Sequence, residues 1–118
     1  MALFKTIDTK NHPTRHFSTK QEKAVAKNLN GNRTLNSGAT KFQPGDVQLE
    51  NMLLECKTKM SHSDSISIKK DWLEKIKKES LFAGKPYYSL IFNFGPDEDN
   101  YAIIDMELFE TLLETLKN

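Results

Sequence analysis

The residues best suited to chemistry stand close together in the passage GDVQLENMLLECKTK, residues 45–59. Asp46 comes at the start of one expected strand, and Glu55 and Lys57 come two positions apart on the next. Because side chains alternate between the faces of a strand, Glu55 and Lys57 share one face and Cys56 points to the other. Carboxylates that converge at a strand end can ligate Mg²⁺, which prefers oxygen ligands and keeps several of its waters.

Two acids and a lysine in this arrangement suit the hydrolysis of a phosphate ester. A bound cation would lower the pKa of an attacking water and neutralise charge on the phosphate transition state. Lys57 would position that water or stabilise the same charge. An acid-x-lysine triplet on a strand is common by chance, and most such triplets are solvated surface charges. Here Leu53 and Leu54 indicate a buried strand, where charges carry a desolvation cost that a functional site explains.

Helical spacing marks the segment before these strands. The stretch STKQEKAVAKNL, which begins at Ser18, has helical periodicity, and Thr19 and Glu22 have the spacing of a capping box. Residues 1–17 show no clear periodicity, so we expect a flexible arm there. A chain of 118 residues is the size of one domain, which we place at residues 18–118.

The rest of the chain predicts two further helices and the strands of one sheet. A short strand at RTL is followed by a shaped loop, and VQL and MLLECKT have the lengths of an antiparallel hairpin. Ser67 is a candidate cap for a helix that begins near Ile68, YYSLIFNF and YAII are strands, and Asp105 caps a last helix. The expected order is αβββαββα, an α/β fold with a central mixed sheet flanked by helices.

Composition limits the classes of protein that fit. Hydrophobic residues make up 37% and charged residues 28%, and no apolar run approaches the ~20 residues of a membrane helix. We therefore expect no membrane partner and a cytoplasmic location, which one cysteine and the lack of a secretory signal also favour. The net charge of +1 combines +6 in residues 1–45 with −5 in residues 46–118. This asymmetry permits a basic face for a polyanion, although solvated surface charges explain it equally well.

In its order of motifs the sequence resembles the PD-(D/E)xK nuclease superfamily, and within it the small Holliday-junction resolvases of archaeal and phage type. The matching residues, in the family's order, are Glu22, Asn36-Ser37-Gly38, Pro44-Gly45-Asp46, Glu55-Cys56-Lys57 and Ser67-Ile68-Lys69-Lys70. The resemblance runs from about Ser18 to Ile104, and SISIKKDWLEKI looks like phage-encoded members of the group. Gly45 departs from the motif, which has Pro directly before Asp, but the carboxylate does the chemistry. The resemblance implies a restriction-endonuclease-like core.

The resemblance also implies roles for individual residues. Asp46 and Glu55 would be metal ligands with the backbone carbonyl of Cys56, and Lys57 would be catalytic. Glu22 would complete the acidic site directly or through water, although it also reads as the capping-box partner of Thr19. Mg²⁺ is the implied cofactor, with Mn²⁺ able to substitute. The residues expected to contact DNA are Ser37, for which a plain turn role is equally open, Lys69, Arg33 and Lys41.

Several other residues are expected to be structural. Trp72 occupies a core position of its helix, and Cys56 reads as a small core residue rather than a nucleophile. We expect solvated charges at Lys70, Lys75 and Lys78.

Together these features predict a Mg²⁺-dependent DNA endonuclease that resolves Holliday junctions or other branched DNA during recombination. A homodimer is expected from the resemblance, since two nicks across a two-fold junction need two sites. Apolar residues of YYSLIFNF or of the last helix would supply its interface, unless they serve the core. The alternatives are a PD-(D/E)xK nuclease for nicking, single-strand or restriction-type cleavage, a non-catalytic DNA-binding module, and a protein-interaction domain unrelated to nucleic acid.

Overall fold

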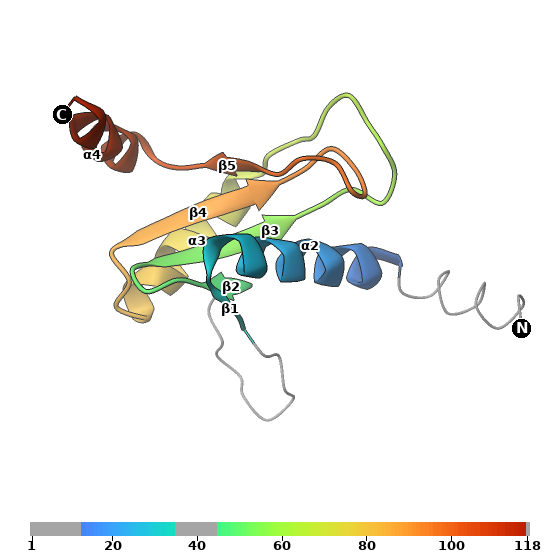
Figure 1. Cartoon of the computed structure of the whole chain (residues 1–118), viewed down its shortest axis with the longest axis horizontal. Helices are drawn as coiled ribbons and strands as arrows, with labels where there is room; N and C mark the ends of the chain where they lie inside the picture. The colour runs from blue at the N-terminus through green and yellow to red at the C-terminus, as the bar shows by residue number, and fades with distance from the viewer. Residues whose placement is uncertain (1–12, 35–44, 118) are drawn as a thin grey trace, which may run out of the picture.

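The computed structural model of the chain describes residues 13–34 and 45–117, and its fold is α/β, with one five-stranded mixed sheet and three helices (Figure 1). The elements are α2 Pro13–Leu29, β1 Asn32–Arg33, β2 Val47–Gln48, β3 Met52–Lys57, α3 Lys70–Phe82, β4 Tyr87–Phe92, β5 Tyr101–Ile103 and α4 Met106–Leu116. Within the described ranges the expected order, helix, three strands, helix, two strands, helix, is confirmed.

The strands follow their sequence order across the sheet, β1-β2-β3-β4-β5. β3 and β4 are parallel, whereas the other neighbouring pairs are antiparallel. Parallel neighbours need a long crossover, and α3 provides it. β3 therefore lies at the centre of the sheet, between the predicted hairpin partner β2 and the long strand β4.

The two large helices cover opposite faces of this central strand. Val25 of α2 is buried in one core cluster with Leu54 and Cys56 of β3. The alternate position Leu53 faces the other side, close to Ile76 of α3, and both side chains are fully buried. In Figure 1, α2 crosses in front of β3 and α3 lies behind it. The alternation of β3 thus directs Leu54 and Cys56 toward α2, and Glu55 and Lys57 toward α3.

Two predicted helix starts were wrong. α2 begins at Pro13 rather than Ser18, so residues 13–17 of the expected arm are helical, while residues 1–12 lie outside the described part. Proline suits the first turn of a helix because its missing N–H has no partner there anyway. Thr19 and Glu22 consequently lie inside the helix, where they cannot form a capping box. α3 begins at Lys70 without a side-chain cap, so Ser67 does not cap it.

The start of the last helix is as predicted. The side chain of Asp105 accepts a hydrogen bond from the Leu108 N–H at 2.8 Å, as a helix cap does. Within the described ranges, none of the helices is both long and apolar enough to pass through a bilayer. The assignment of a single domain to residues 18–118 stays a prediction.

Candidate metal and catalytic centre

Asp46 lies directly across from Glu55. In the β2–β3 register Val47 faces Leu54, so the residue before Val47 falls beside the residue after Leu54. The Asp46 N–H donates to the Leu54 carbonyl at 2.8 Å, and the Asp46 Oδ2 accepts from the Cys56 N–H at 2.8 Å. These bonds extend the strand pairing by one residue and hold the Asp46 carboxylate against β3.

The turn that delivers Asp46 depends on Gly45. Its φ of +67° lies in the left-handed region, and a Cβ there would come 3.0 Å from the Leu54 carbonyl oxygen. The Gly45 N–H donates to the Glu79 Oε1 at 2.8 Å, which ties the turn to α3. A glycine directly before Asp46 is therefore required by the backbone of this turn.

Glu55 is only 7% exposed and is flanked by two lysines. Its Oε2 lies 3.5 Å from the Lys57 Nζ, and its Oε1 lies 3.7 Å from the Lys75 Nζ. Lys75 also pairs with Glu79 at 3.4 Å. Although desolvation lowers the pKa of Lys75, the carboxylates of Glu55 and Glu79 outweigh it and raise that pKa. Lys75 is 58% exposed, as the expected solvated charge would be, and it also pairs with two acids beside β3.

Trp72 contacts the candidate catalytic lysine rather than serving only as core. The Lys57 Nζ lies 4.7 Å from the centroid of the Trp72 ring, and the Lys69 Nζ lies 5.9 Å from it. An ammonium near an aromatic face is attracted to the negative charge of that face. Trp72 therefore helps to orient Lys57 and brings Lys69 to the same place, as expected for a residue beside the site.

Glu22 reaches the centre from α2. Burial and the Asp46 carboxylate raise its pKa, whereas Arg33 partly offsets them, with Nη2 3.4 Å from the Glu22 Oε1. Arg33 thus pairs with an acid of the centre in this structure, and its predicted contact with a DNA phosphate stays a prediction. The interaction with Asp46 is compatible with the expected place of Glu22 in the acidic site.

The centre carries more negative charge than its environment favours. Burial is the largest cause that raises the pKa of Asp46, opposed by the hydrogen bond from the Cys56 N–H. Burial also raises the pKa of Glu55, and the Asp46 carboxylate adds to that rise. Buried acids that repel one another are stabilised by a cation between them.

The residue types present suit a hard divalent cation, which takes carboxylate and carbonyl oxygens. The Cys56 carbonyl faces the Asp46 side of β3, because the N–H and C=O of one strand residue point to the same side. Within residues 13–34 and 45–117, however, no three His, Cys, Asp or Glu side chains already form a metal-ligating group. Asp46 is turned to a backbone N–H, Glu55 to lysines and Glu22 to Arg33, so ligation requires these side chains to reorient.

Cys56 is a core residue, as expected. It is buried in the cluster beneath α2, where burial and the three nearby carboxylates raise the pKa of its thiol. A thiol of this kind stays protonated and is a poor nucleophile.

The structure brings four of the predicted site residues together, namely Glu22, Asp46, Glu55 and Lys57, with Lys69 beside them. Ser37 and Lys41 lie outside the described residues. Lys75 and Glu79 were missed, although their spacing from Trp72 places all three on one helix face, which is a usable signal. Comparisons of the chain with protein-family models, with curated proteins and with solved structures give no match.

Proposed function

We propose that the chain is a divalent-metal-dependent DNA endonuclease of the PD-(D/E)xK class. The observation that carries this proposal is the position of Asp46 opposite Glu55, with Lys57 on the same face of β3 and 3.5 Å from Glu55. The element order, the mixed sheet and the parallel β3–β4 pair joined by α3 support a restriction-endonuclease-like core.

In this proposal the side chains have separate tasks. Asp46, Glu55 and the Cys56 carbonyl hold Mg²⁺, or Mn²⁺ in its place, and Glu22 completes the site directly or through water. The bound cation supplies a more acidic water and neutralises charge on the scissile phosphate. Lys57, steadied by the Trp72 ring, stabilises the same developing charge.

The cations around Glu55 suit a nucleic-acid backbone. Lys57, Lys69 and Lys75 lie on the α3 side of β3, where they would neutralise phosphates next to the cleaved bond. Four-way junctions or other branched DNA are proposed as the substrate on the resemblance alone. Nicking, single-strand or restriction-type cleavage is the runner-up with the same chemistry.

We also propose a homodimer formed through α4. Its exposed large apolar side chains are Met106, Phe109, Leu112, Leu113 and Leu116. If each has a full accessible area of about 200 Å², their exposed fractions leave roughly 550 Å², which approaches the ~800 Å² per partner of a standard interface. Sedimentation should give a dimer for the wild type and for Thr111→Glu, and a monomer for Leu112→Glu. Only monomer in the presence of junction DNA would exclude this proposal.

We propose that the protein works in the cytoplasm, or in the host cytoplasm if it is phage-encoded. DNA as substrate and one buried free cysteine support an intracellular location.

The decisive experiment uses end-labelled four-way junction and matched linear duplex, each with Mg²⁺ or Ca²⁺, and an Asp46→Asn variant. Paired symmetric cuts in the junction that require Mg²⁺ and Asp46 would support a resolvase. Equal cutting of the linear duplex would retain the nuclease and remove the junction specificity. No cutting with any metal, despite tight binding, would refute nuclease activity.

A second candidate is a non-catalytic DNA-binding module. The observation that favours it is that each acid of the centre already has a partner, without a preformed metal-ligating group among the described residues. Salt-sensitive DNA binding together with the absence of Mg²⁺ or Mn²⁺ binding in a calorimetric titration would support this alternative.

A further inference from the structure

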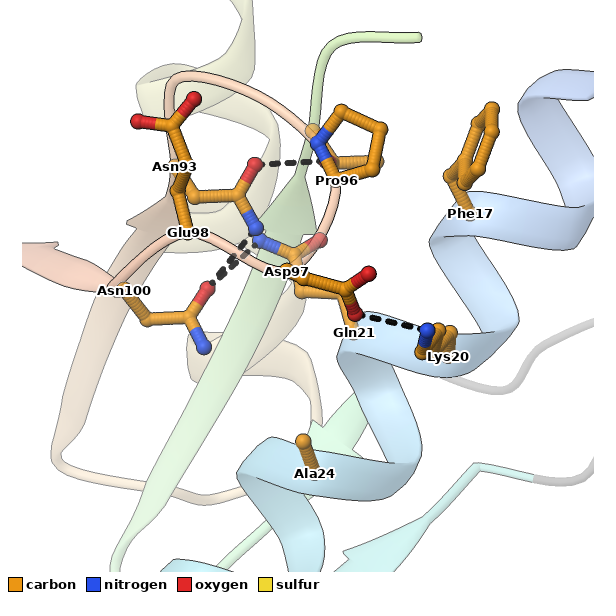
Figure 2. Close-up of a pocket in the computed structure, with 10 residues that line it drawn as sticks. Phe17, Lys20, Gln21, Ala24, Asn93, Pro96, Asp97, Glu98 and Asn100 are labelled. Carbon is orange, nitrogen blue, oxygen red and sulfur yellow. Dashed lines mark hydrogen bonds and ion pairs between the residues drawn. The ribbon is translucent and has the colours of Figure 1, made fainter. Parts of the chain in front are cut away.

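A separate cavity of about 230 Å³ lies at the carboxyl end of β3 and β4, on the α2 side. Its lining comes from one face of α2, from the residue after Lys57 and from the loop that follows β4 (Figure 2). The carboxyl ends of neighbouring parallel strands are a common place for ligands in α/β sheets. The cavity is therefore well placed to bind something beside the catalytic centre.

The polar wall of the cavity is a chain of amides with fixed orientation. The Thr58 hydroxyl donates to the Asn93 Oδ1 at 2.6 Å, and the Asn93 Nδ2 donates to the Asn100 Oδ1 at 3.2 Å. The Gln21 Nε2 donates to the same Asn100 oxygen at 3.1 Å and to the Lys57 carbonyl at 2.8 Å. Because a carbonyl can only accept, this last bond fixes which end of the Gln21 amide is the nitrogen.

One acceptor in this wall is left without a donor. Gln21 is only 5% exposed, and its Oε1 is buried without a hydrogen-bond partner. A buried polar atom that lacks a partner is costly, so native proteins rarely leave one without a reason. Because the Gln21 Oε1 has almost no accessible surface, a donor from a molecule in the cavity reaches it only when the Gln21 amide shifts toward the cavity.

The rest of the lining combines apolar residues with one lysine and two acids at the rim. Figure 2 shows Phe17 and Pro96 facing each other across its opening. The charged residues at the rim are already paired, Lys20 with Asp97 at 2.6 Å and Glu98 with His62. Lys20 is the one lysine or arginine among the described lining residues, and because it is already paired, a phosphate would find no free cation there. The lining favours a flat, uncharged group that carries an N–H donor.

We propose that the cavity receives one unpaired nucleobase of the DNA substrate, with an N–H of the base donating to the Gln21 Oε1 and the ring against Phe17. This inference rests on the proposed nuclease function. Thr58 lines the cavity and directly follows Lys57, whose side chain enters the catalytic centre on the other face of β3. A base held here belongs to a nucleotide near the scissile phosphate. Every natural base carries an N–H and a ring face, so the site tolerates all sequences.

The test is a binding titration with a single-stranded oligonucleotide that contains one 2-aminopurine, in Ca²⁺ to prevent cleavage. Wild-type protein should quench the 2-aminopurine fluorescence through stacking on Phe17. Ala24→Met fills the cavity without removing a hydrogen bond, and it should weaken binding about tenfold and abolish quenching. Asn28→Met makes the same kind of change on the exposed part of α2 outside the cavity, and it should bind as the wild type does.

A second measurement does not depend on how well any variant folds. An oligonucleotide with an abasic site in place of the 2-aminopurine should bind the wild type about tenfold more weakly. Ala24→Met should bind the abasic and the intact oligonucleotides equally well, because the variant and the abasic site remove the same contact.

The outcomes separate this inference from the nuclease proposal, which cleavage of junction DNA in Mg²⁺ tests independently. Quenching that Ala24→Met does not affect, or an abasic oligonucleotide that binds as well as the intact one, would overturn the base-binding cavity whether or not DNA is cleaved. Failure of the wild type to bind the oligonucleotide would also overturn it. Cavity-dependent quenching without cleavage would retain the cavity and remove the nuclease.

Discussion

The centre around Asp46 and the amide cavity beside Gln21 lie on opposite faces of β3, and they treat buried polar atoms in different ways. The centre buries carboxylates whose pKa values are raised, and lysine and arginine side chains pair with Glu55 and Glu22. The cavity buries neutral amides that hold one another in fixed orientations. The first arrangement lowers stability, as buried acids that repel one another do, and the second supports the fold while leaving one buried acceptor without a donor.

The largest expected effect separates the acids of the two regions. Asp46→Asn should lower the rate of Mg²⁺-dependent DNA cleavage by about 10³-fold, because a group that stabilises the reacting charge is lost. Asp97→Asn makes the same chemical change at the rim of the cavity, where Asp97 has a φ of 64° that Asn tolerates. Its cleavage rate should match the wild type. Equal losses in both variants, measured with end-labelled substrate, would remove the distinction between the regions.

Two neighbouring residues of α2 give the next largest contrast. Gln21→Leu should lower the free energy of unfolding by about 1–3 kcal/mol, because it removes the donor to the Lys57 carbonyl and one of the two donors to the Asn100 Oδ1. Glu22→Gln, one position further, keeps a similar shape in the acidic centre and should not destabilise the protein. Denaturant unfolding of both variants measures the difference. A loss in Glu22→Gln as large as that in Gln21→Leu would argue that the acidic centre is structural.

A smaller effect follows from the raised pKa of Glu55. A carboxyl group whose pKa is raised by folding favours the fold below its unfolded-state pKa, and that contribution is lost as pH rises through the folded-state pKa. Without metal, Glu55→Gln should therefore raise the free energy of unfolding at pH 8 by about 0.5–2 kcal/mol, the usual size of a stabilising substitution. At pH 4 the gain should vanish. Thermal unfolding across this range measures it, and a Gln variant that is less stable at pH 8 would contradict the assignment.

The smallest effect concerns the rim of the cavity. Lys20 and Asp97 form an ion pair between side chains that are 58% and 67% exposed. Such pairs contribute about 0–1 kcal/mol, so Lys20→Met should leave the thermal midpoint nearly unchanged. DNA binding through the cavity should also persist, because Lys20 donates nothing to the base. A large loss of stability would show that the pair is more than a rim contact.

Local sequence patterns predicted much of the fold and the proximity of Asp46, Glu55 and Lys57. Glu55 and Lys57 share a face because side chains alternate along a strand. Asp46 lies beside Glu55 because the short turn between β2 and β3 fixes which residues of the two strands face each other. The helix cap at Asp105 was also predictable from the local sequence, because the N–H that it binds is only three residues away.

The features that were missed depend on contacts between distant parts of the chain. Lys75 and Glu79 reach the centre because α3 packs on β3 with the helix face that carries them turned toward the sheet. Helical spacing shows which residues share a face, but it does not show which face of the helix is turned toward the sheet. Gln21 bonds to Asn100, which lies 79 positions along the chain. Nothing local distinguishes such an amide from a solvated one.

The most direct test of the account is a calorimetric titration of Mn²⁺ into the wild type and into Asp46→Asn, with Asp97→Asn as control. We expect one site per chain in the wild type and in Asp97→Asn. Heat that varies with the buffer should accompany binding, because acids with raised pKa values release protons as they take the metal. Binding should be lost in Asp46→Asn. No heat in the wild type, or unchanged binding in Asp46→Asn, would contradict a metal centre at the junction of β2 and β3.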